Sequence, residues 1–413
     1  MAIGRTVAAL SKKFRVGTGS VIGGRAALIV DPHLLAHLTR ARDVVIVSAT
    51  NGKTTTTRLL AAAIGADQPV ISNWLGANMT PGLVAALGPS SAFATAVLEV
   101  DERWLPRVLQ EIKVSHGDAS PLRRGVVLLN LSRDQLDRTQ EVRHLAEAWR
   151  KAFKENQPTF VVANADDPLV TYAALTANHV VWVSTGMQWT ADASGCPACA
   201  GRISFSETNW SCSNCDLQRP TPSISLTDDG IYADQNYSIS LPLPGRVNRM
   251  NATFAFAAAR QFSIDATRVI HAMEEVEEVA GRYRTATFAG QTVRLLLAKN
   301  PAGWHEALNL LERPDTPAII GINSRIADGH DPSWLWDVDF EQLKGRYVIA
   351  TGERRHDLAV RLHYAEVEHA VVEHFADCVR IAGQHLESND ITIDIVSNYT
   401  AFQDQLAQLG GLV

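Results

Sequence analysis

The chain has 413 residues, of which 46% are hydrophobic and 20% charged, enough for two or three domains with buried cores. Its net charge of -6 argues against a protein that holds nucleic acid by a broad basic surface. The N-terminal apolar run is broken at Ser11, Lys12 and Lys13, and no stretch approaches the roughly 18 apolar residues of a membrane span. We therefore expect a cytoplasmic enzyme without a transmembrane segment.

Strand-like apolar runs alternate with helix-like segments along the chain. Strands are predicted at 44–49, 95–100, 125–131 and 159–165, with a helix over 54–65 after the first strand. This βαβ alternation predicts an α/β fold with a mostly parallel sheet covered by helices. The polar stretch 186–240 interrupts the pattern and is interpreted as an insertion. A second α/β run begins at 292, and the domain boundary is placed near 286.

The turn after the first strand has the sequence SATNGKTT at 48–55. In a phosphate-binding loop, backbone N–H groups and the next helix N-terminus face the phosphates, a lysine reaches the terminal phosphates, and the following hydroxyl binds Mg²⁺. Lys53 and Thr54 would take these two roles. The general pattern begins with a glycine where this chain has Val47, so the loop is a departure from it.

The loop resembles the nucleotide loop of the Mur ligase and folylpolyglutamate synthase superfamily, which usually has glycine at the position of Ala49. Further motifs of that superfamily follow in order, namely LEVDE at 98–102, NLSRDQLDR at 130–138, NADDP at 164–168 and GRVNRMNATFAFAAA at 245–259. The resemblance implies a Mur ligase-like central ATP-binding domain over 1–285. It also implies a smaller α/β domain over 286–413.

The resemblance assigns roles to particular residues. It implies that ATP is held by Thr50, Asn51, Gly52, Lys53, Thr54 and Thr55, that Thr54 and Glu99 bind Mg²⁺, and that Asn248 or Asn251 approaches the adenine. Gln135 stands in the NLSRDQLDR motif where the family usually has histidine, and an amide is a weaker metal ligand than imidazole. Family members phosphorylate a carboxylate with ATP, and an amine then attacks the acyl phosphate.

Four of the five cysteines form two Cys-x-x-Cys pairs separated by twelve residues, at Cys196, Cys199, Cys212 and Cys215. Two such knuckles place four thiolates around one tetrahedral Zn²⁺. With no open ligand position the site is structural, and it would hold together a zinc ribbon at about 190–222. Free or redox-active cysteines are the alternative. Cys378 stands apart and is expected to be a small buried residue.

The cysteine ribbon and four later segments, at 296–308, 322–341, 351–367 and 397–402, resemble the MurT family of synthetase subunits. The LAKNP segment at 297–301 stands where amino-acid-adding relatives have an Asp-Tyr-Ala-His-Asn-Pro-like sequence. The resemblance implies ATP-dependent amidation of the D-Glu α-carboxylate in the lipid II stem peptide, giving D-isoglutamine. It implies ammonia from a GatD-like class I glutamine amidotransferase, in a heterodimer that meets lipid II at the inner membrane surface.

In the same family an aspartate of the synthetase subunit completes the partner's Cys-His-Asp triad. The candidates here are Asp328, Asp331, Asp337 and Asp339, and Trp334 and Trp336 between them are the kind of aromatic anchors that a docking surface favours. Asp331 also fits a helix N-cap followed by Pro332, with the two tryptophans in the core. Asp337 is therefore our first choice.

Two other hypotheses remain open at this point. One is a Mur or folylpolyglutamate-type ligase that adds an amino acid directly. The other is a non-catalytic scaffold that binds a nucleotide and a partner. Substrate-dependent ATP turnover, and the nature of the amine that is consumed, distinguish these hypotheses from amidation.

Overall fold

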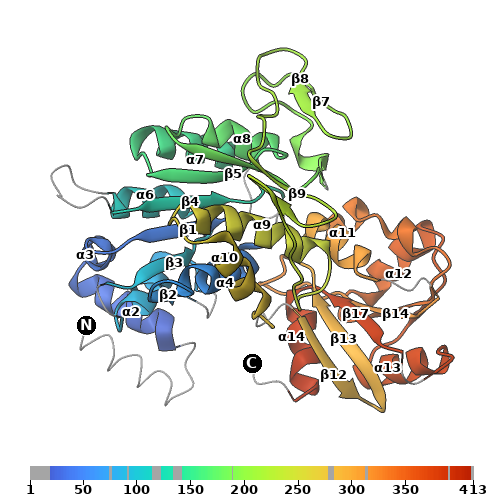
Figure 1. The fold of residues 1–413 in the computed structure, drawn as a ribbon. Helices are drawn as coiled ribbons and strands as arrows, with labels where there is room; N and C mark the ends of the chain where they lie inside the picture. The colour runs from blue at the N-terminus through green and yellow to red at the C-terminus, as the bar shows by residue number, and fades with distance from the viewer. Residues whose placement is uncertain are drawn as a thin grey trace. The chain divides into compact units, whose positions relative to one another are not determined.

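The computed structural model describes residues 19–73, 77–90, 93–113, 122–133, 142–187, 189–277, 283–311, 315–388 and 391–410. The contacts divide the chain into two compact units (Figure 1). The first comprises Met1–Ser132 and Gln140–Glu277, and the second comprises Arg133–Thr139 and Glu278–Val413. Residue 286, near which the boundary is expected, lies within a strand of the second unit. Gln135 lies outside the described residues.

A nine-stranded sheet forms the centre of the first unit, in the order β11-β10-β9-β6-β5-β4-β1-β3-β2. From β2 to β9 every neighbouring pair is parallel, whereas β9, β10 and β11 are antiparallel. The strands are β1 Val44–Ser48, β2 Val70–Ser72, β3 Thr95–Glu99, β4 Arg124–Leu128, β5 Phe160–Asn164, β6 Val180–Ser184, β9 Ile224–Leu226, β10 Ile231–Tyr232 and β11 Asn236–Tyr237.

Helices cover this sheet because its strands are apolar on both faces. The helices are α2 Gly19–Val30, α3 Leu34–Thr39, α4 Lys53–Gly65, α5 Thr80–Leu87, α6 Leu105–Ile112, α7 Val142–Glu155, α8 Pro168–Ala174, α9 Arg246–Arg260 and α10 Ala266–Glu274. Val44 and Ile46 pack into one core with side chains of α3 and α5 to α8. The alternate residues Val45 and Val47 point to the opposite face, where α4, α9 and α10 lie.

The polar stretch 186–240 is only partly an insertion. The antiparallel pair β7 Ile203–Phe205 and β8 Trp210–Cys212 forms a separate two-stranded sheet. Strands β9 to β11 instead extend the central sheet at its edge. Their short and polar sequences resemble loops because an edge strand buries little apolar surface. The insert is therefore shorter than the composition of 186–240 suggests.

The second unit contains a six-stranded sheet in the order β12-β13-β17-β14-β15-β16, parallel apart from the β12–β13 pair. Helices α11 and α12 with the 3₁₀ turns η2 and η3 pack on one face, and α13 and α14 on the other. The elements are β12 Tyr283–Phe288, β13 Gln291–Leu297, α11 Pro301–Asn309, β14 Ala318–Gly321, η2 Pro332–Asp337, η3 Phe340–Leu343, β15 Val348–Thr351, α12 Arg355–Tyr364, β16 His369–Val371, α13 Phe375–Gln384, β17 Ile393–Ser397 and α14 Tyr399–Gln408.

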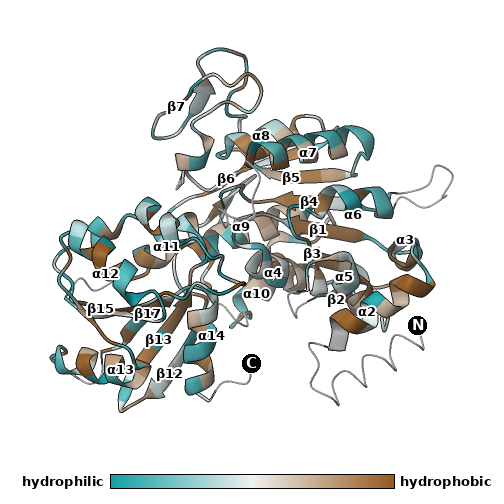
Figure 2. Ribbon diagram, turned by 180° about the vertical axis from the view of Figure 1, so that it is seen from behind, coloured by the Kyte–Doolittle hydropathy of each residue, from teal (hydrophilic) through white to brown (hydrophobic). Residues whose placement is uncertain are grey.

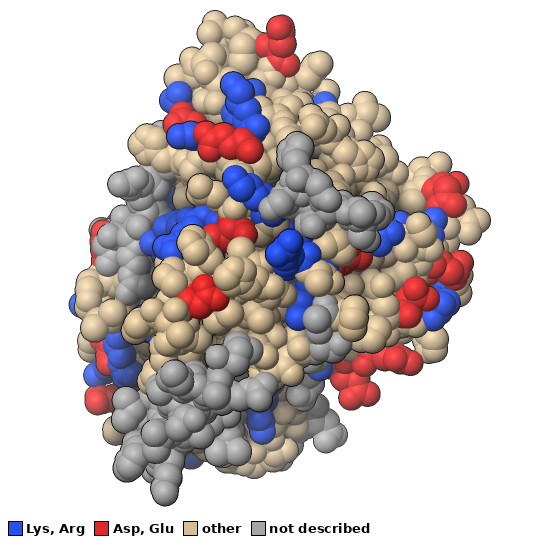
Figure 3. Space-filling view, turned by 90° about the vertical axis from the view of Figure 1, so that its left-hand side faces the viewer, with Lys and Arg blue, Asp and Glu red and all other residues tan. Residues whose placement is uncertain are grey.

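The predicted α/β class with parallel sheets is confirmed. Figure 2 shows hydrophobic strands such as β5 and β13, and helices such as α7 and α12 that carry hydrophilic residues. Cys378 lies fully buried in the core under α13, as expected of a small apolar residue. Among the described residues no helix combines the length and hydropathy needed to cross a membrane. On the face drawn in Figure 3, basic and acidic side chains are interspersed, so that face is not broadly basic.

Candidate nucleotide, metal and docking sites

The loop between β1 and α4 has the geometry of an anion-binding turn. Gly52 precedes α4 with φ 85°, the left-handed region that favours glycine. A Cβ at this position would lie 2.5 Å from Oδ1 of Asn251, so a side chain would fill the space beside the loop. Gly52 offers no side chain to cap α4, and the N-terminus of a helix is a position that attracts anions.

The loop is held in place by the segment that follows β4. The Thr50 N–H donates to the Asn130 carbonyl at 3.0 Å, and the Asn51 N–H donates to Asn130 Oδ1 at 2.9 Å. The Asn130 amide donates back to the Asn51 carbonyl at 3.0 Å. Thr50 Oγ1 also accepts from the Ser132 N–H at 3.0 Å. Two motifs about 80 residues apart in sequence are thereby fixed against each other, which preorganises the loop.

Lys53 is the first residue of α4 and is only 8% exposed. Its ammonium group donates to the carbonyls of Ala49 and Thr50 and to Glu102 Oε2, the last at 3.0 Å. Glu102 is 6% exposed, and its carbonyl accepts the indole N–H of the buried Trp149 at 2.8 Å. Burial raises the pKa of the Glu102 carboxyl, and the neighbouring Lys53 opposes that rise.

Sequence analysis did not single out Glu102. Its only signal is its place in the LEVDE motif, two residues after a predicted strand and three after Glu99. The structure brings it to Lys53 because β3 lies beside β1 in the sheet. The carboxyl end of β3 therefore reaches the phosphate loop that follows β1.

Glu99 ends β3 and is buried, opposite Val47 in the β1–β3 register. Asn73 fixes the Glu99 backbone, since its Oδ1 accepts the Glu99 N–H at 2.8 Å and its amide donates to the Glu99 carbonyl at 2.9 Å. The Asn78 amide lies 3.4 Å from Glu99 Oε1. A carboxylate held at the same sheet edge as Lys53 is the type of oxygen ligand that Mg²⁺ prefers. Asn73 and Asn78 are further residues that the motif search missed.

The two candidate adenine contacts differ in their surroundings. The Asn248 amide donates to the Pro244 carbonyl at 2.6 Å and so serves the start of α9. Asn251 is buried, and its Oδ1 is the atom nearest to the space above Gly52. Within the described part of the chain, the Asn251 side-chain amide makes no hydrogen bond. The geometry therefore favours Asn251 as the one that meets a nucleotide.

The NADDP motif connects the end of β5 to α8. Asp167 caps α8 by accepting from the N–H groups of Leu169 at 2.8 Å and Val170 at 3.1 Å, and its other oxygen accepts from Leu131 at 2.8 Å. Burial raises the pKa of Asp167 to about 6, although these three hydrogen bonds oppose the rise. Because Leu131 lies between Asn130 and Ser132, Asp167 also supports the segment that fixes the phosphate loop.

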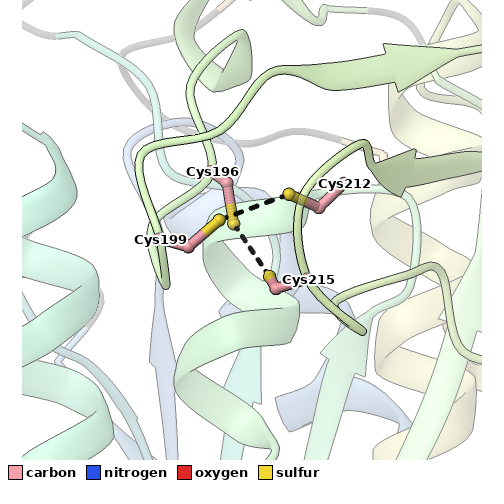
Figure 4. Close-up of side chains that lie close together, drawn as sticks. All are labelled: Cys196, Cys199, Cys212 and Cys215. Atoms are coloured by element: carbon pink, nitrogen blue, oxygen red, sulfur yellow. Dashed lines mark hydrogen bonds between the residues drawn. The ribbon is translucent and has the colours of Figure 1, made fainter.

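The four ribbon cysteines point toward a common centre (Figure 4). Their sulfur atoms all lie within 4.8 Å of one another. The Cys196–Cys215 and Cys199–Cys212 sulfur separations are 3.7 and 3.5 Å. A tetrahedron of sulfurs about 2.3 Å from Zn²⁺ has edges of about 3.8 Å, so the donor set fits this ion. The N–H of Gly201 lowers the pKa of Cys199 to about 6, which favours the thiolate that a metal needs.

Two side chains attach the ribbon to the NADDP motif. The indole N–H of the buried Trp210 donates to the Ala165 carbonyl at 2.9 Å. Arg219, just after the last cysteine pair, donates from Nε to Asp166 Oδ1 at 2.8 Å. Asp166 also accepts the N–H of Thr185 at 2.7 Å. The Trp210 indole and the Arg219 guanidinium thus join the ribbon to the first unit, and the ribbon has little core of its own.

Replacing Cys212 with Ser is expected to release the metal and unfold the ribbon, because a structural zinc site supplies folding free energy directly. Elemental analysis should give zinc near one equivalent in the native protein and at most about a tenth of that in Cys212→Ser. Limited proteolysis should then cut between 196 and 219. Cys378→Ser removes a thiol outside the ribbon and should retain the zinc. Native protein without stoichiometric zinc would contradict the assignment.

The aspartates proposed for a partner's triad lie in different environments. Asp328 is buried, and its oxygens accept from the backbone N–H and hydroxyl of Thr400 and from the Arg325 N–H, so it serves the fold. Asp331 caps η2 through the Ser333 N–H at 2.9 Å, and this hydrogen bond lowers its pKa. Asp337 ends η2 with its side chain 38% exposed, and its Oδ2 lies 3.3 Å from Arg133 Nη1. Asp339 is exposed.

One of the two tryptophans of this segment is buried and the other is exposed. Trp334 is buried and stacks on Trp304 with ring centres 6.0 Å apart, so the idea that it anchors a partner is wrong. Trp336 is 55% exposed and meets the ring of Tyr364 edge-on at 5.5 Å. Val360, one turn earlier on α12, is also exposed. We call Trp336, Val360 and Tyr364 the Trp336 patch.

Two family models match the chain. The Mur ligase middle domain matches residues 47–259, which include the phosphate loop, Glu99, the ribbon and most of α9. The MurT ligase C-terminal family matches residues 297–402, which include the Trp336 patch and the candidate aspartates.

Curated relatives agree with these matches. The chain is 28% identical to the protein named lipid II isoglutaminyl synthase (glutamine-hydrolyzing) subunit MurT of Staphylococcus aureus strain COL, over 95% of this chain and 93% of the relative. It is also 28% identical to the subunit of that name from Streptococcus pneumoniae strain ATCC BAA-255 / R6, over 84% of this chain and 83% of the relative.

Solved structures share the fold at lower identity. A pseudomurein peptide ligase type C from Methanothermus fervidus superposes with a TM-score of 0.67 at 20% identity, over 89% of this chain and 79% of that one. MurF from Acinetobacter baumannii gives a TM-score of 0.65 at 14% identity, over 91% and 79% of the two chains. Because the middle-domain model alone matches more than half of its residues, the chain belongs to the Mur ligase family, with a C-terminal part of the MurT type.

Proposed function

We propose that this chain is the synthetase subunit of a lipid II isoglutaminyl synthase, which uses ATP to convert the α-carboxylate of D-Glu in the lipid II stem peptide to an amide. The observation that carries the proposal is the match to MurT subunits along 95% of the chain. The anion-binding turn at Gly52 and Lys53 supports the dependence on ATP. The buried carboxylate of Glu99 beside that turn supports the dependence on Mg²⁺.

The reaction proceeds in two steps. A carboxylate oxygen of the substrate attacks the γ-phosphorus of ATP, the bond to ADP breaks, and an acyl phosphate forms. Ammonia then attacks the acyl carbon, phosphate leaves with the bonding electron pair, and one proton is released to give the neutral amide. Thr54 and Glu99 would hold Mg²⁺, which would supply positive charge to the phosphoryl oxygens. Lys53 and the N-terminus of α4 would offset the charge that develops on the same oxygens.

The LAKNP segment supports ammonia rather than an amino acid as the attacking amine. Asn300 is buried and caps α11 by accepting the Gly303 N–H at 2.9 Å, and Pro301 begins that helix. The Lys299 ammonium lies 4.9 Å from the ring centre of Tyr399. These side chains therefore contribute to local packing at the position where amino-acid-adding relatives carry their Asp-Tyr-Ala-His-Asn-Pro-like sequence.

The ammonia comes from a GatD-like class I glutamine amidotransferase that forms a heterodimer with this chain. The word subunit in the names of the MurT relatives supports such a partner. The Trp336 patch is an exposed aromatic surface of the kind that is enriched at interfaces, and Asp337 adjoins it. The complex works in the cytoplasm and reaches its lipid-linked substrate at the inner membrane face.

The test is to incubate the purified chain with Mg-ATP, lipid II and ammonium, and to follow ADP release and the mass of the stem peptide. Amidated product is expected with ammonium, whereas glutamine should act only after the partner is added. Free amino acids in place of ammonium test direct addition, and a product that carries an added amino acid would reject amidation. The absence of substrate-dependent ATP turnover would instead indicate a nucleotide-binding scaffold.

A further inference from the structure

The ammonium group of Lys53 has no donor left for a phosphate. A lysine ammonium has three N–H donors, and Lys53 directs its Nζ to Ala49, Thr50 and Glu102. Two of these acceptors are loop carbonyls, and the third is a carboxylate. A phosphate oxygen that binds Lys53 must therefore displace one of them.

Of the three acceptors, the Glu102 carboxylate is the one whose loss would most change the electrostatic environment of the Lys53 ammonium group. The Lys53 and Glu102 side chains are 9% and 8% exposed, so their attraction is screened much less than that of a surface pair. The backbone of Glu102 is held by Trp149, which keeps the carboxylate near the loop. Glu102 thus occupies one of the three donor positions on Lys53, and it does so with a negative charge.

We propose that Glu102 is an internal counter-ion that competes with the phosphates of the nucleotide for Lys53, and so limits nucleotide affinity and favours release of ADP. The inference rests on the proposed function, because it assumes that this loop binds ATP. Glu102 is a positioning residue in this scheme, since it acts on the nucleotide through Lys53. It keeps the charge of a buried lysine compensated while the loop is empty.

The test is the affinity of Glu102→Gln for Mg-ADP, measured by isothermal titration calorimetry. The glutamine keeps the shape and an acceptor oxygen but removes the competing charge. We expect ADP to bind about tenfold more tightly, mainly through slower dissociation. AMP lacks the terminal phosphates that such a lysine reaches, so its affinity should not change. Glu102→Ala also removes the charge and is expected to change the affinity in the same direction.

Two controls separate this role from a purely structural one. Glu147 is the exposed ion-pair partner of Arg143 on α7, in the same unit as Glu102. Glu147→Gln removes the same charge and should leave the affinity for ADP unchanged. In a Lys53→Met background, Glu102→Gln should no longer raise ADP affinity, because the residue for which the two anions compete is absent. If Glu102 were merely structural, Glu102→Gln would lower thermal stability without raising the affinity for ADP in either background.

The outcomes distinguish this inference from the function on which it rests. If the native chain binds Mg-ADP and both Glu102 variants bind it equally or more weakly, the counter-ion role is rejected while the ligase proposal stands. If ADP and AMP gain equally, competition at Lys53 is also rejected. If the native chain binds no Mg-nucleotide, the proposed function and the counter-ion role fail together.

Discussion

Replacing Lys53 with Ala is expected to lower ATP-dependent amidation by about 10³-fold or more, because in the proposed reaction its ammonium group stabilises charge on the transferred phosphoryl group. The fold should persist. The Glu102 carboxyl, whose pKa burial already raises, can take up a proton when its cation is removed. The measurement is ADP release with lipid II and ammonium, together with a thermal unfolding curve.

Lys151→Ala is the matched control for this substitution. Lys151 is an exposed lysine on α7 that lies 3.9 Å from Glu155, and its loss removes the same charge far from the phosphate loop in sequence. Activity should remain close to that of the native chain. Amidation by Lys53→Ala within a few-fold of the native rate would show that this loop is not where the phosphoryl group is transferred.

The parts of the molecule that the sequence predicts are those encoded locally. The strand at 44–48, the turn at Gly52 and the helix from Lys53 follow from apolar runs, a left-handed glycine and helix-forming residues within one short segment. The four cysteines are likewise close in sequence, and their spacing predicts the cluster that the structure contains.

What the sequence does not predict depends on contacts between distant segments. Glu102 meets Lys53 across 49 positions, and no periodicity marks such a pair. Trp334 and Trp336 are two residues apart in a 3₁₀ turn, and only the packing of Trp334 on Trp304 decides which ring is buried. Strands β9 to β11 are too short and polar to be recognised before the sheet edge that they join is known.

Replacing Asp337 with Asn is expected to abolish glutamine-dependent amidation, with a loss of about 10³ to 10⁴-fold, because the partner's histidine would lose the charge that orients it. Asp337 is chosen because it adjoins the exposed Trp336, and its carboxylate is partly exposed and lies 3.3 Å from Arg133 Nη1. Ammonium supplied in solution should bypass the defect, since the substitution leaves the proposed Mg-ATP site at Lys53 and Glu99 unchanged. The measurement compares glutamine and ammonium as nitrogen donors in the assembled complex.

Asp331→Asn and Asp339→Asn are the matched controls, as each removes one exposed carboxylate from the same segment. Both should keep glutamine-dependent activity within a few-fold, because Asp331 already caps η2 and an asparagine caps a helix nearly as well. Asp328→Asn tests the fold instead, since both oxygens of Asp328 are used within the unit. Loss of glutamine use in Asp331→Asn alone would move the triad role to that residue. Full activity in all four variants would exclude this segment from the triad. The proposal of a ligase would remain, because it does not depend on these aspartates.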